Sequence, residues 1–369
     1  MFTILWFLLV LSFLVIIHEL GHFFAAKWAK VHVEEFGLGY PPRVKKLFRW
    51  WNTWFSLNVL PFGGFVKLYG DDVEPMENEP SPDGERDGGK FADQPGWKRL
   101  IIILAGVTIN FIFGVVAFAF IFSQTGIPQQ RKYVLIDTIA ESSPAQASGI
   151  QVGEEIRALV SGDQRVIVPN SEYFIQQVSQ HRGEDLTLVV AREGQEREVT
   201  LRARSVEETP EGQGALGVGL SDMEFVFYPW YEMPWRGMVA GLQDALALSG
   251  VILMALGDMV GQLVGHGVLP KDISGPVGIV DQASQLGLAK QGWLTTLNFA
   301  ALLSVQLAIM NLLPIPALDG GRALFILLEP IVGRDRRRKW EQHANTYGFF
   351  FLVGLIVIVT IKDVIGVIR

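Results

Sequence analysis

Long apolar runs without a single charged residue constrain this chain more than any other feature of its sequence. Met1–Ile17, Leu100–Phe122 and Gln291–Leu318 contain no Asp, Glu, Lys or Arg, and Thr346–Ile361 is a fourth such run near the C-terminus. A helix of about 20 apolar residues is long enough to cross the hydrocarbon core of a bilayer. The sequence therefore predicts a polytopic α-helical membrane protein with about four transmembrane helices.

The first run also resembles the apolar core of a secretory signal peptide, which is removed from the mature protein. It has no basic residue before the apolar core, and it leads into His18 and Glu19 rather than into a small-residue cleavage site. We therefore expect this segment to be retained as a span.

Basic residues indicate the orientation, because cytoplasmic loops carry an excess of Lys and Arg. Here they follow the first run, precede the second, and lie between the third and the fourth. They are Lys27, Lys30, Arg43, Lys45, Lys46, Arg49, Lys98, Arg99, Arg334, Arg336, Arg337, Arg338 and Lys339. With four spans all of them lie on one side, so we expect both termini and residues 123–290 to lie outside the cytoplasm.

The composition of residues 126–205 is that of a small soluble domain. Four strands are predicted from alternating apolar residues between Gly- and Pro-containing turns, and one helix after a Ser or Asn cap. The strands are 133–139, 154–160, 185–192 and 197–204, and the helix is 171–180. Their order resembles a PDZ domain, which can bind an extended chain or a C-terminus by adding it to its own sheet. A spacer that only obstructs access is the open alternative.

Two further segments are interpreted from their composition. Residues 233–264 are apolar on average but contain Asp244 and Asp258, which favours an interfacial or groove-lining helix over a span. A fifth crossing is the alternative, and it would reverse the location of everything after it. Residues 71–94 are acidic and rich in Pro and Gly, which is typical of a mobile cytoplasmic connection.

Composition also excludes some classes of function. The 369 residues include no cysteine, so neither a disulfide nor a thiolate nucleophile or metal ligand is available. The net charge of −7 is unevenly distributed, and no basic stripe with interleaved aromatic residues indicates nucleic-acid binding.

Ionisable residues at the end of the first run give the strongest indication of chemistry. His18-Glu19-Leu20-Gly21-His22 is an H-E-x-x-H pattern, and residues four apart on a helix share one face. Both imidazoles can then reach one metal ion, with Glu19 beside it as a general base for an attacking water. The alternative is a pair of hydrogen-bonded helix histidines, which gives no reason to place three such groups in an apolar segment.

Two histidines leave a catalytic zinc one protein ligand short. The remaining histidines lie in the soluble domain, in flanking loops or in the basic segment; they are His32, His181, His266 and His343. Asp319 is the better candidate, because it follows the third run at the same depth as His18 and His22. The alternative for Asp319 is a helix cap where the chain leaves the membrane.

Several motifs occur together in a distinctive order. HELGH is followed by LPFGGFVKLYG (60–70), AGVTIN (105–110), the PDZ-like insert and NLLPIPALDGG (311–321). Together they resemble the site-2 protease family of intramembrane zinc metalloproteases, in its bacterial regulator-of-sigma-E (RIP metalloprotease) form. The resemblance implies Zn²⁺ as cofactor, the metal ligands His18, His22 and Asp319, Glu19 as general base, and substrate contacts near Asn311. The family usually has A-G-P where this chain has A-G-V, and well-known relatives carry two PDZ domains rather than one.

A hairpin is predicted in residues 54–70, with two strand-like arms around the turn Pro61–Gly64. An exposed strand edge there would hold an unwound substrate in extended form, so we expect Pro61, Gly63 and Gly64 to contact substrate. A hairpin that only braces the first span is the alternative.

These predictions combine into one organisation and one function. The expected regions are the first two spans with the membrane-associated hairpin and acidic loop (1–123), the PDZ-like domain (124–222), the interfacial helix (223–290) and the last two spans (291–369). The predicted activity is intramembrane cleavage of single-span proteins, such as anti-sigma factors already trimmed outside or signal-peptide remnants, in a bacterial inner membrane, with the active site near the cytoplasmic side. The lipid bilayer is the other expected partner. The alternatives are a non-catalytic PDZ-bearing adaptor and a metal or proton transporter.

Overall fold

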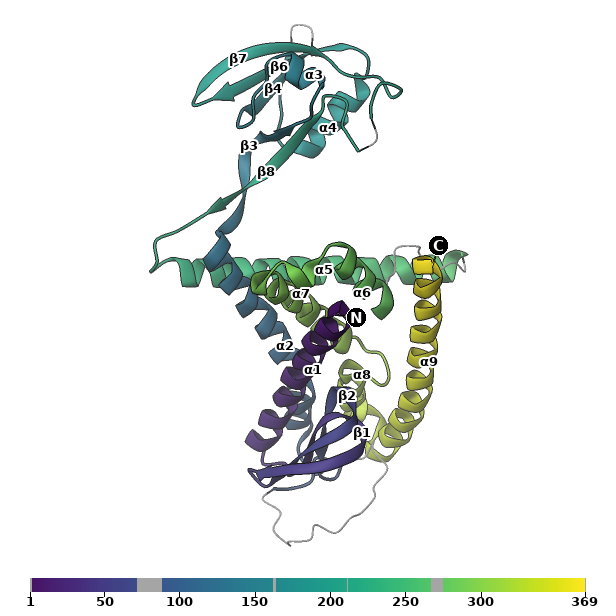
Figure 1. Ribbon diagram of the computed structural model, residues 1–369. Coiled ribbons are helices and arrows are strands. Elements are labelled where there is room, and N and C mark those ends of the chain that lie inside the picture. Colours follow the sequence, from purple (N-terminus) through teal and green to yellow (C-terminus); the bar gives the residue numbers. More distant parts are fainter. Residues whose placement is uncertain (1, 72–87, 162–163, 211, 267–274, 369) are drawn as a thin grey trace. The chain divides into compact units, whose positions relative to one another are not determined.

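The chain forms two compact units, which are described separately. In the computed structural model, residues 2–71, 88–161, 164–210, 212–266 and 275–368 are described (Figure 1). The first unit comprises residues 1–121 and 231–369, and the second comprises residues 122–230. Most of the acidic loop expected in 71–94 lies outside the described residues.

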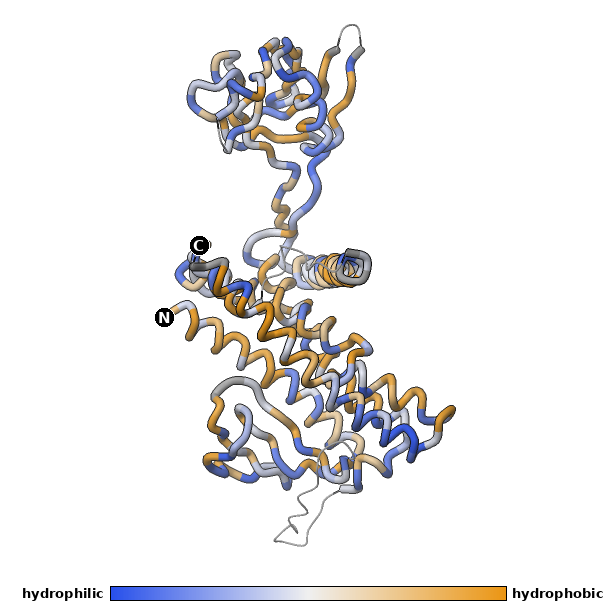
Figure 2. Tube along the Cα trace, turned by 90° about the vertical axis from the view of Figure 1, so that its right-hand side faces the viewer, coloured by the Kyte–Doolittle hydropathy of each residue, from blue (hydrophilic) through white to orange (hydrophobic). Residues whose placement is uncertain are grey.

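The first unit is largely helical. Its helices are α1 (Phe2–Trp28), α2 (Gly96–Thr125), α5 (Met233–His266), α6 (Pro276–Gln285), the 3₁₀ turn η1 (Leu288–Lys290), α7 (Trp293–Leu312), α8 (Asp319–Val332) and α9 (Arg334–Ile368). Hydrophobic residues dominate the long helices (Figure 2). The four predicted spans correspond to α1, α2, α7 and α9, and α1 continues without a break through the H-E-x-x-H residues.

Five helices, rather than four, are long and apolar enough to cross a membrane, and the additional one is α5. The chain is thus a multi-pass membrane protein, but the expected number of spans is not established. Both views show α5 lying across the direction of α2 and α9 rather than along it (Figures 1 and 2). Its Gly237 and Gly241 pack on the last turns of α2, where an added Cβ would meet backbone oxygens at 3.1 and 2.6 Å.

The helical conformation is interrupted between α7 and α8. Pro314 and Pro316 lie in this break, and Asp319 begins α8 instead of ending the preceding span as expected from the sequence. The break folds tightly against the start of α8, because a Cβ on Gly320 would lie 2.2 Å from the Leu312 oxygen. Only glycine fits at such a distance.

The hairpin consists of β1 (Val33–Trp50) and β2 (Thr53–Leu68). The two arms expected in residues 54–70 are present, but they do not pair with each other as in a simple hairpin. Residues 35–38 of β1 stand opposite residues 54–57 and also opposite residues 64–67. The first half of β1 therefore lies between the arms, and within the described residues the second arm (64–68) has no strand on its other side.

Glycine also sets the distance between the first two helices. A Cβ on Gly21 would lie 2.5 Å from the Ala105 carbonyl oxygen of α2. The glycine of the H-E-x-x-H pattern therefore allows α1 to contact the α2 backbone. Apolar residues of α1, α2, α8 and the hairpin then form one buried cluster that includes Phe23, Phe36 and Ile102.

The second unit is a six-stranded antiparallel sheet with two helices. The strand order is β7-β6-β4-β3-β8, with β5 paired to β4. The elements are β3 (Ile127–Ile139), α3 (Pro144–Ala147), β4 (Glu155–Ser161), β5 (Gln164–Ile167), α4 (Ser171–Gln180), β6 (Asp185–Arg192), β7 (Gln195–Arg202) and β8 (Val218–Val226). The predicted helix 171–180 is confirmed as α4, with Asn170 as its cap. The four predicted strands are confirmed, although β3 begins six residues earlier than predicted and other ends differ by one or two residues. The edge strand β8 and the short β5 were not predicted, and the resemblance to a PDZ domain stays a prediction.

Candidate metal centre

Three side chains from two distant helices converge on one point in the first unit. His18 Nε2 lies 3.0 Å from Asp319 Oδ2, and His22 Nε2 lies 3.3 Å from the same oxygen. The two Nε2 atoms are 3.1 Å apart. The structure thus brings together the three residues that the sequence predicts as metal ligands, although about three hundred residues separate α1 from Asp319.

These distances fit a zinc ion. Ligand atoms about 2.0 Å from a tetrahedral zinc stand about 3.3 Å from one another, close to the three distances above. Two neutral imidazoles and a carboxylate are also a ligand set that zinc enzymes use, with a fourth position left for water. Asp319 Oδ2 is buried, and among the described residues its polar neighbours are the two imidazole nitrogens.

The position of Asp319 follows from the start of α8. The helix cap is Leu318, and no side chain makes a capping hydrogen bond there. Asp319 is therefore not the helix cap that the sequence left as an alternative, and its carboxylate is directed at the imidazoles instead. The first turn of a helix favours a negative charge, which helps to keep this buried carboxylate ionised.

The helix α2 packs against one side of the two imidazole rings. A Cβ on Gly106 would lie 2.5 Å from His22 Nε2 and 2.8 Å from His18 Cε1. Any other residue at this position would displace both rings. The His22 Nδ1 atom lies 2.8 Å from the Ile102 carbonyl oxygen, and His18 Nδ1 lies 3.4 Å from the side-chain nitrogen of Asn110.

Glu19 lies between the three ligands and the hairpin. It interacts electrostatically with His18, His22 and Asp319, and its carboxylate is hydrogen-bonded by the backbone of Val66 in the second arm of β2. A Cβ on Gly64 would lie 3.5 Å from Glu19 Cγ. The second arm of β2, which pairs with β1 along one edge only, therefore passes directly beside the expected general base.

The residues expected to contact substrate are placed as follows. Gly63 has a φ of +81°, and a Cβ there would lie 2.3 Å from the Tyr40 ring, so both conformation and space require glycine. Gly64 faces Glu19. Asn311 lies in the last turn of α7, half-buried, and its side chain makes no hydrogen bond within the described residues. The side chain of Pro61 lies outside the described residues.

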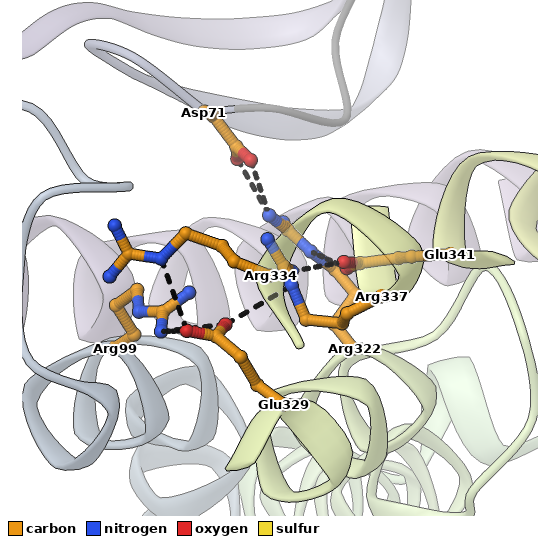
Figure 3. A network of polar contacts seen from close by, with 7 residues as sticks. All are labelled: Asp71, Arg99, Arg322, Glu329, Arg334, Arg337 and Glu341. Atoms are coloured by element: carbon orange, nitrogen blue, oxygen red, sulfur yellow. Dashed lines mark hydrogen bonds and ion pairs between the residues drawn. The ribbon is translucent and has the colours of Figure 1, made fainter. Parts of the chain in front are cut away.

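A network of ion pairs connects Asp71, which follows the hairpin, with α2, α8 and α9 (Figure 3). Arg322, one turn after Asp319, donates to both oxygens of Asp71 at 2.8 and 2.7 Å. Arg99 at the start of α2 donates to both oxygens of Glu329 in α8 at 2.7 and 2.8 Å. The end of the hairpin and the start of α2 are thus both fixed to the helix that carries the third ligand.

The start of α9 completes the network. Glu341 accepts from Arg337 and also lies 3.8 Å from Arg322, and Arg337 lies 3.1 Å from Glu329. Burial alone would lower the pKa of Arg322, but Asp71 and Glu341 hold it above its usual range. The guanidinium therefore stays charged, and both acidic residues stay paired.

Sequence reasoning missed the contribution of α2 to this centre. Ile102, Gly106 and Asn110 are spaced by four residues, which places them on one face of the helix. A carboxamide within an uncharged span was the available signal, because a buried polar group is retained in an apolar helix only where it is used. The network around Glu329 had no comparable signal, since its members are distributed over the whole chain.

Comparison with known proteins gives the same class as the site. The profile of Peptidase family M50 matches residues 6–355. A protein of Clostridium perfringens named as a "putative zinc metalloprotease" is 33% identical over 360 residues, covering 97% of each chain. Proteins of the same name from Clostridium acetobutylicum, 31% identical over 99% of this chain and 98% of that one, and from Agrobacterium fabrum, 26% identical over 97% and 94%, are also similar.

A multi-pass membrane protein with an H-E-x-x-H helix, a distant aspartate and this match is a membrane metalloprotease of the zinc-dependent class. The chain belongs to peptidase family M50, the site-2 proteases. The recognition made from the motifs is confirmed, and so is zinc as the cofactor.

Proposed function

We propose that this metalloprotease is an intramembrane endopeptidase that cleaves single-span membrane proteins. The observation that carries the proposal is the convergence of His18, His22 and Asp319 beside the second arm of the hairpin, with both histidines on a helix apolar enough for a bilayer. His18 and His22 would hold zinc through Nε2, and Asp319 through a carboxylate oxygen. Bound there, zinc supplies a Lewis acid that polarises the scissile carbonyl and activates a water for attack.

The residues of the chain supply the proton transfers and the alignment. Glu19 takes a proton from the attacking water and returns it to the departing amine. A substrate helix hides its carbonyls in its own hydrogen bonds, so the segment to be cut has to unwind first. The free edge of residues 64–68 offers backbone groups with which the unwound segment pairs, and this pairing places its carbonyl beside Glu19.

We propose four crossings, formed by α1, α2, α7 and α9, with α5 lying at the membrane interface. Two aspartates within α5 and its direction across α2 and α9 support this arrangement. The second unit then lies outside the cytoplasm of a bacterial inner membrane, and the basic start of α9 lies inside. Because the chain has no cysteine, labelling of Gln213→Cys and Arg336→Cys proteins in intact cells tests the two sides directly.

We propose further that the second unit binds an extended segment of the substrate. A groove of about 310 Å³ lies between α4 and β8, lined by Phe174, Ile175 and Val218 among others. The edge strand β8 is open to a further strand. At one end of the groove, Asp222 of β8 accepts hydrogen bonds from the backbone and hydroxyl of Ser171 in α4. Ile175→Glu, at a solvent-exposed position of the groove, should change which substrates are cut while leaving zinc bound.

The experiment that tests the proposed activity is co-expression of the chain with a tagged single-span protein. Wild-type protein should release a shorter fragment, and Glu19→Gln should abolish release while keeping zinc bound. Glu198→Gln is the matched control, because Glu198 is exposed on β7 of the second unit. Persistent cleavage by the Glu19→Gln protein would overturn the assignment of the base, and the absence of cleavage by the wild type would favour the non-catalytic adaptor.

A further inference from the structure

Both ligand imidazoles turn their second nitrogen toward the same face of α2. The His22 Nδ1 atom faces the Ile102 carbonyl oxygen, and His18 Nδ1 faces the Asn110 side chain. Gly106 lies between these two positions, in contact with both rings. One helix face therefore contacts the two ligands through groups at four-residue spacing.

The hydrogen on His22 is fixed by this arrangement. A carbonyl oxygen only accepts hydrogen bonds, so the contact at 2.8 Å requires the hydrogen of the neutral ring on Nδ1. Nε2 then presents its lone pair toward His18 and Asp319. This is the tautomer that a metal needs.

His18 also has to present the lone pair of Nε2 to a metal, and this requirement fixes the orientation of the Asn110 carboxamide. With its nitrogen toward His18, the carboxamide would donate to Nδ1 and force the ring hydrogen onto Nε2, where it blocks a metal. A half-turn of the carboxamide exchanges two ends of nearly the same shape and places Oδ1 at His18 Nδ1.

We propose that Asn110 is a positioning residue of the metal centre. Its Oδ1 accepts the Nδ1 hydrogen of His18 and thereby presents Nε2 to the metal, as the Ile102 carbonyl does for His22. The inference rests on the zinc site of the proposed function. Removal of such an outer partner typically weakens metal affinity about 10–100-fold.

A purely structural role for the carboxamide does not explain these contacts. Asn110 is fully buried within the uncharged stretch 100–122 of α2, where an unused carboxamide is costly. The contact of Asn110 with α7 is made by its backbone carbonyl, which accepts from Ser304 Oγ at 2.8 Å. The hydrogen bond between the two helices thus does not involve the side-chain amide.

The test is the Zn²⁺ affinity of the purified full-length chain, measured by competition with a chelator. Asn110→Leu keeps the volume but removes the acceptor, and it should bind Zn²⁺ about 10–100-fold more weakly than the wild type. Asn110→Asp keeps an acceptor oxygen and should bind at least as tightly as the wild type. Wild-type affinity in the Leu protein, or equal losses in both proteins, would overturn the proposal.

Three controls keep this test decisive. Asn110→Ala removes the acceptor without adding bulk, so it replaces the Leu protein if that variant does not fold, and thermal unfolding without metal checks the fold of each. Ser304→Ala removes the backbone contact and should leave affinity unchanged. The visible absorption of Co²⁺-loaded protein should be the same for the wild type and Asn110→Asp and altered for Asn110→Leu. No substrate is involved, so a failure of cleavage would count against the proposed function and leave this comparison intact.

Discussion

The two units of the chain bury different kinds of side chain. The core of the second unit is an apolar cluster that includes Ile136, Ile156 and Leu188, and its buried Glu154 pairs with an arginine at the surface. The first unit buries histidine, asparagine, arginine and glutamate, and Arg99 and Glu341 are only 2% and 1% exposed.

The difference reflects what holds each unit together. A sheet in water is stabilised by removing apolar surface from solvent, but helices in lipid gain nothing from that effect against one another. Their contacts depend on close packing at small residues and on polar groups that are costly unless paired. Buried polar residues in the first unit therefore belong either to the ion pairs and hydrogen bonds that connect its elements or to the metal centre.

The largest effect is expected where this pairing is broken. Glu341→Ala leaves only Glu329 and Asp71 to balance the arginines of the network, so buried positive charge is left in excess, and it should destabilise the first unit by about 3–5 kcal/mol. Thermal unfolding of the purified protein in detergent measures the change. Arg334→Ala is the matched control, because this exposed partner of Glu329 should contribute at most about 1 kcal/mol. Equal, small effects of both substitutions would show that the ion-pair network does not stabilise the first unit.

A core substitution in the second unit should be slightly milder and act on that unit alone. Leu188→Ala opens a cavity in the sheet core and should cost about 2–5 kcal/mol. Limited proteolysis reports the opening of the second unit, and elemental analysis should find unchanged zinc. Loss of zinc from this variant would contradict the independence of the two units.

Acid should weaken the first unit through Glu329. Burial alone would raise the pKa of Glu329, but Arg99, Arg334 and Arg337 hold it below its usual range. Its contribution is therefore fully present above the pKa of an unfolded glutamate and is lost as the pH falls through the lower folded value. The unfolding temperature of the first unit should fall between about pH 5 and pH 3, and the Glu329→Gln protein should show a smaller fall over the same range.

The smallest effect is expected at a surface pair of the sheet. Thr187 Oγ1 and Thr200 Oγ1 lie 2.9 Å apart on β6 and β7. Thr187→Ala should cost about 0.2–1 kcal/mol, as is usual for one cross-strand pair. A loss as large as that of Leu188→Ala would mean that the second unit does not depend mainly on its apolar core.

Sequence reasoning predicted those parts of the molecule that local pattern determines. The apolar runs gave the helices, the cap at Asn170 gave α4, and the four-residue spacing of His18 and His22 placed both rings on one face. Asp319 was found from its depth in the membrane and from the motif around it, but its place at the start of α8 was not. Pro314 and Pro316 indicate from the sequence that the helix breaks before Asp319, but they do not show that a new helix begins at Asp319 itself.

Features built from distant residues were not predictable in this way. The first half of β1 lies between the two arms of β2, and no local signal distinguishes that order from a simple hairpin. The pairing of Arg99 with Glu329 joins residues more than two hundred positions apart, and the contact of Asn110 with His18 depends on how α1 and α2 pack. Each of these depends on tertiary structure rather than on pattern.

The most direct test of the central claim is the zinc content of the purified full-length protein. We expect the wild type and Glu19→Gln to hold one zinc ion per chain, and Asp319→Ala and His22→Ala to hold little. A wild-type content of zinc in the Asp319→Ala protein, or a wild type without zinc after reconstitution, would contradict a metal centre built from the first helix and the start of α8.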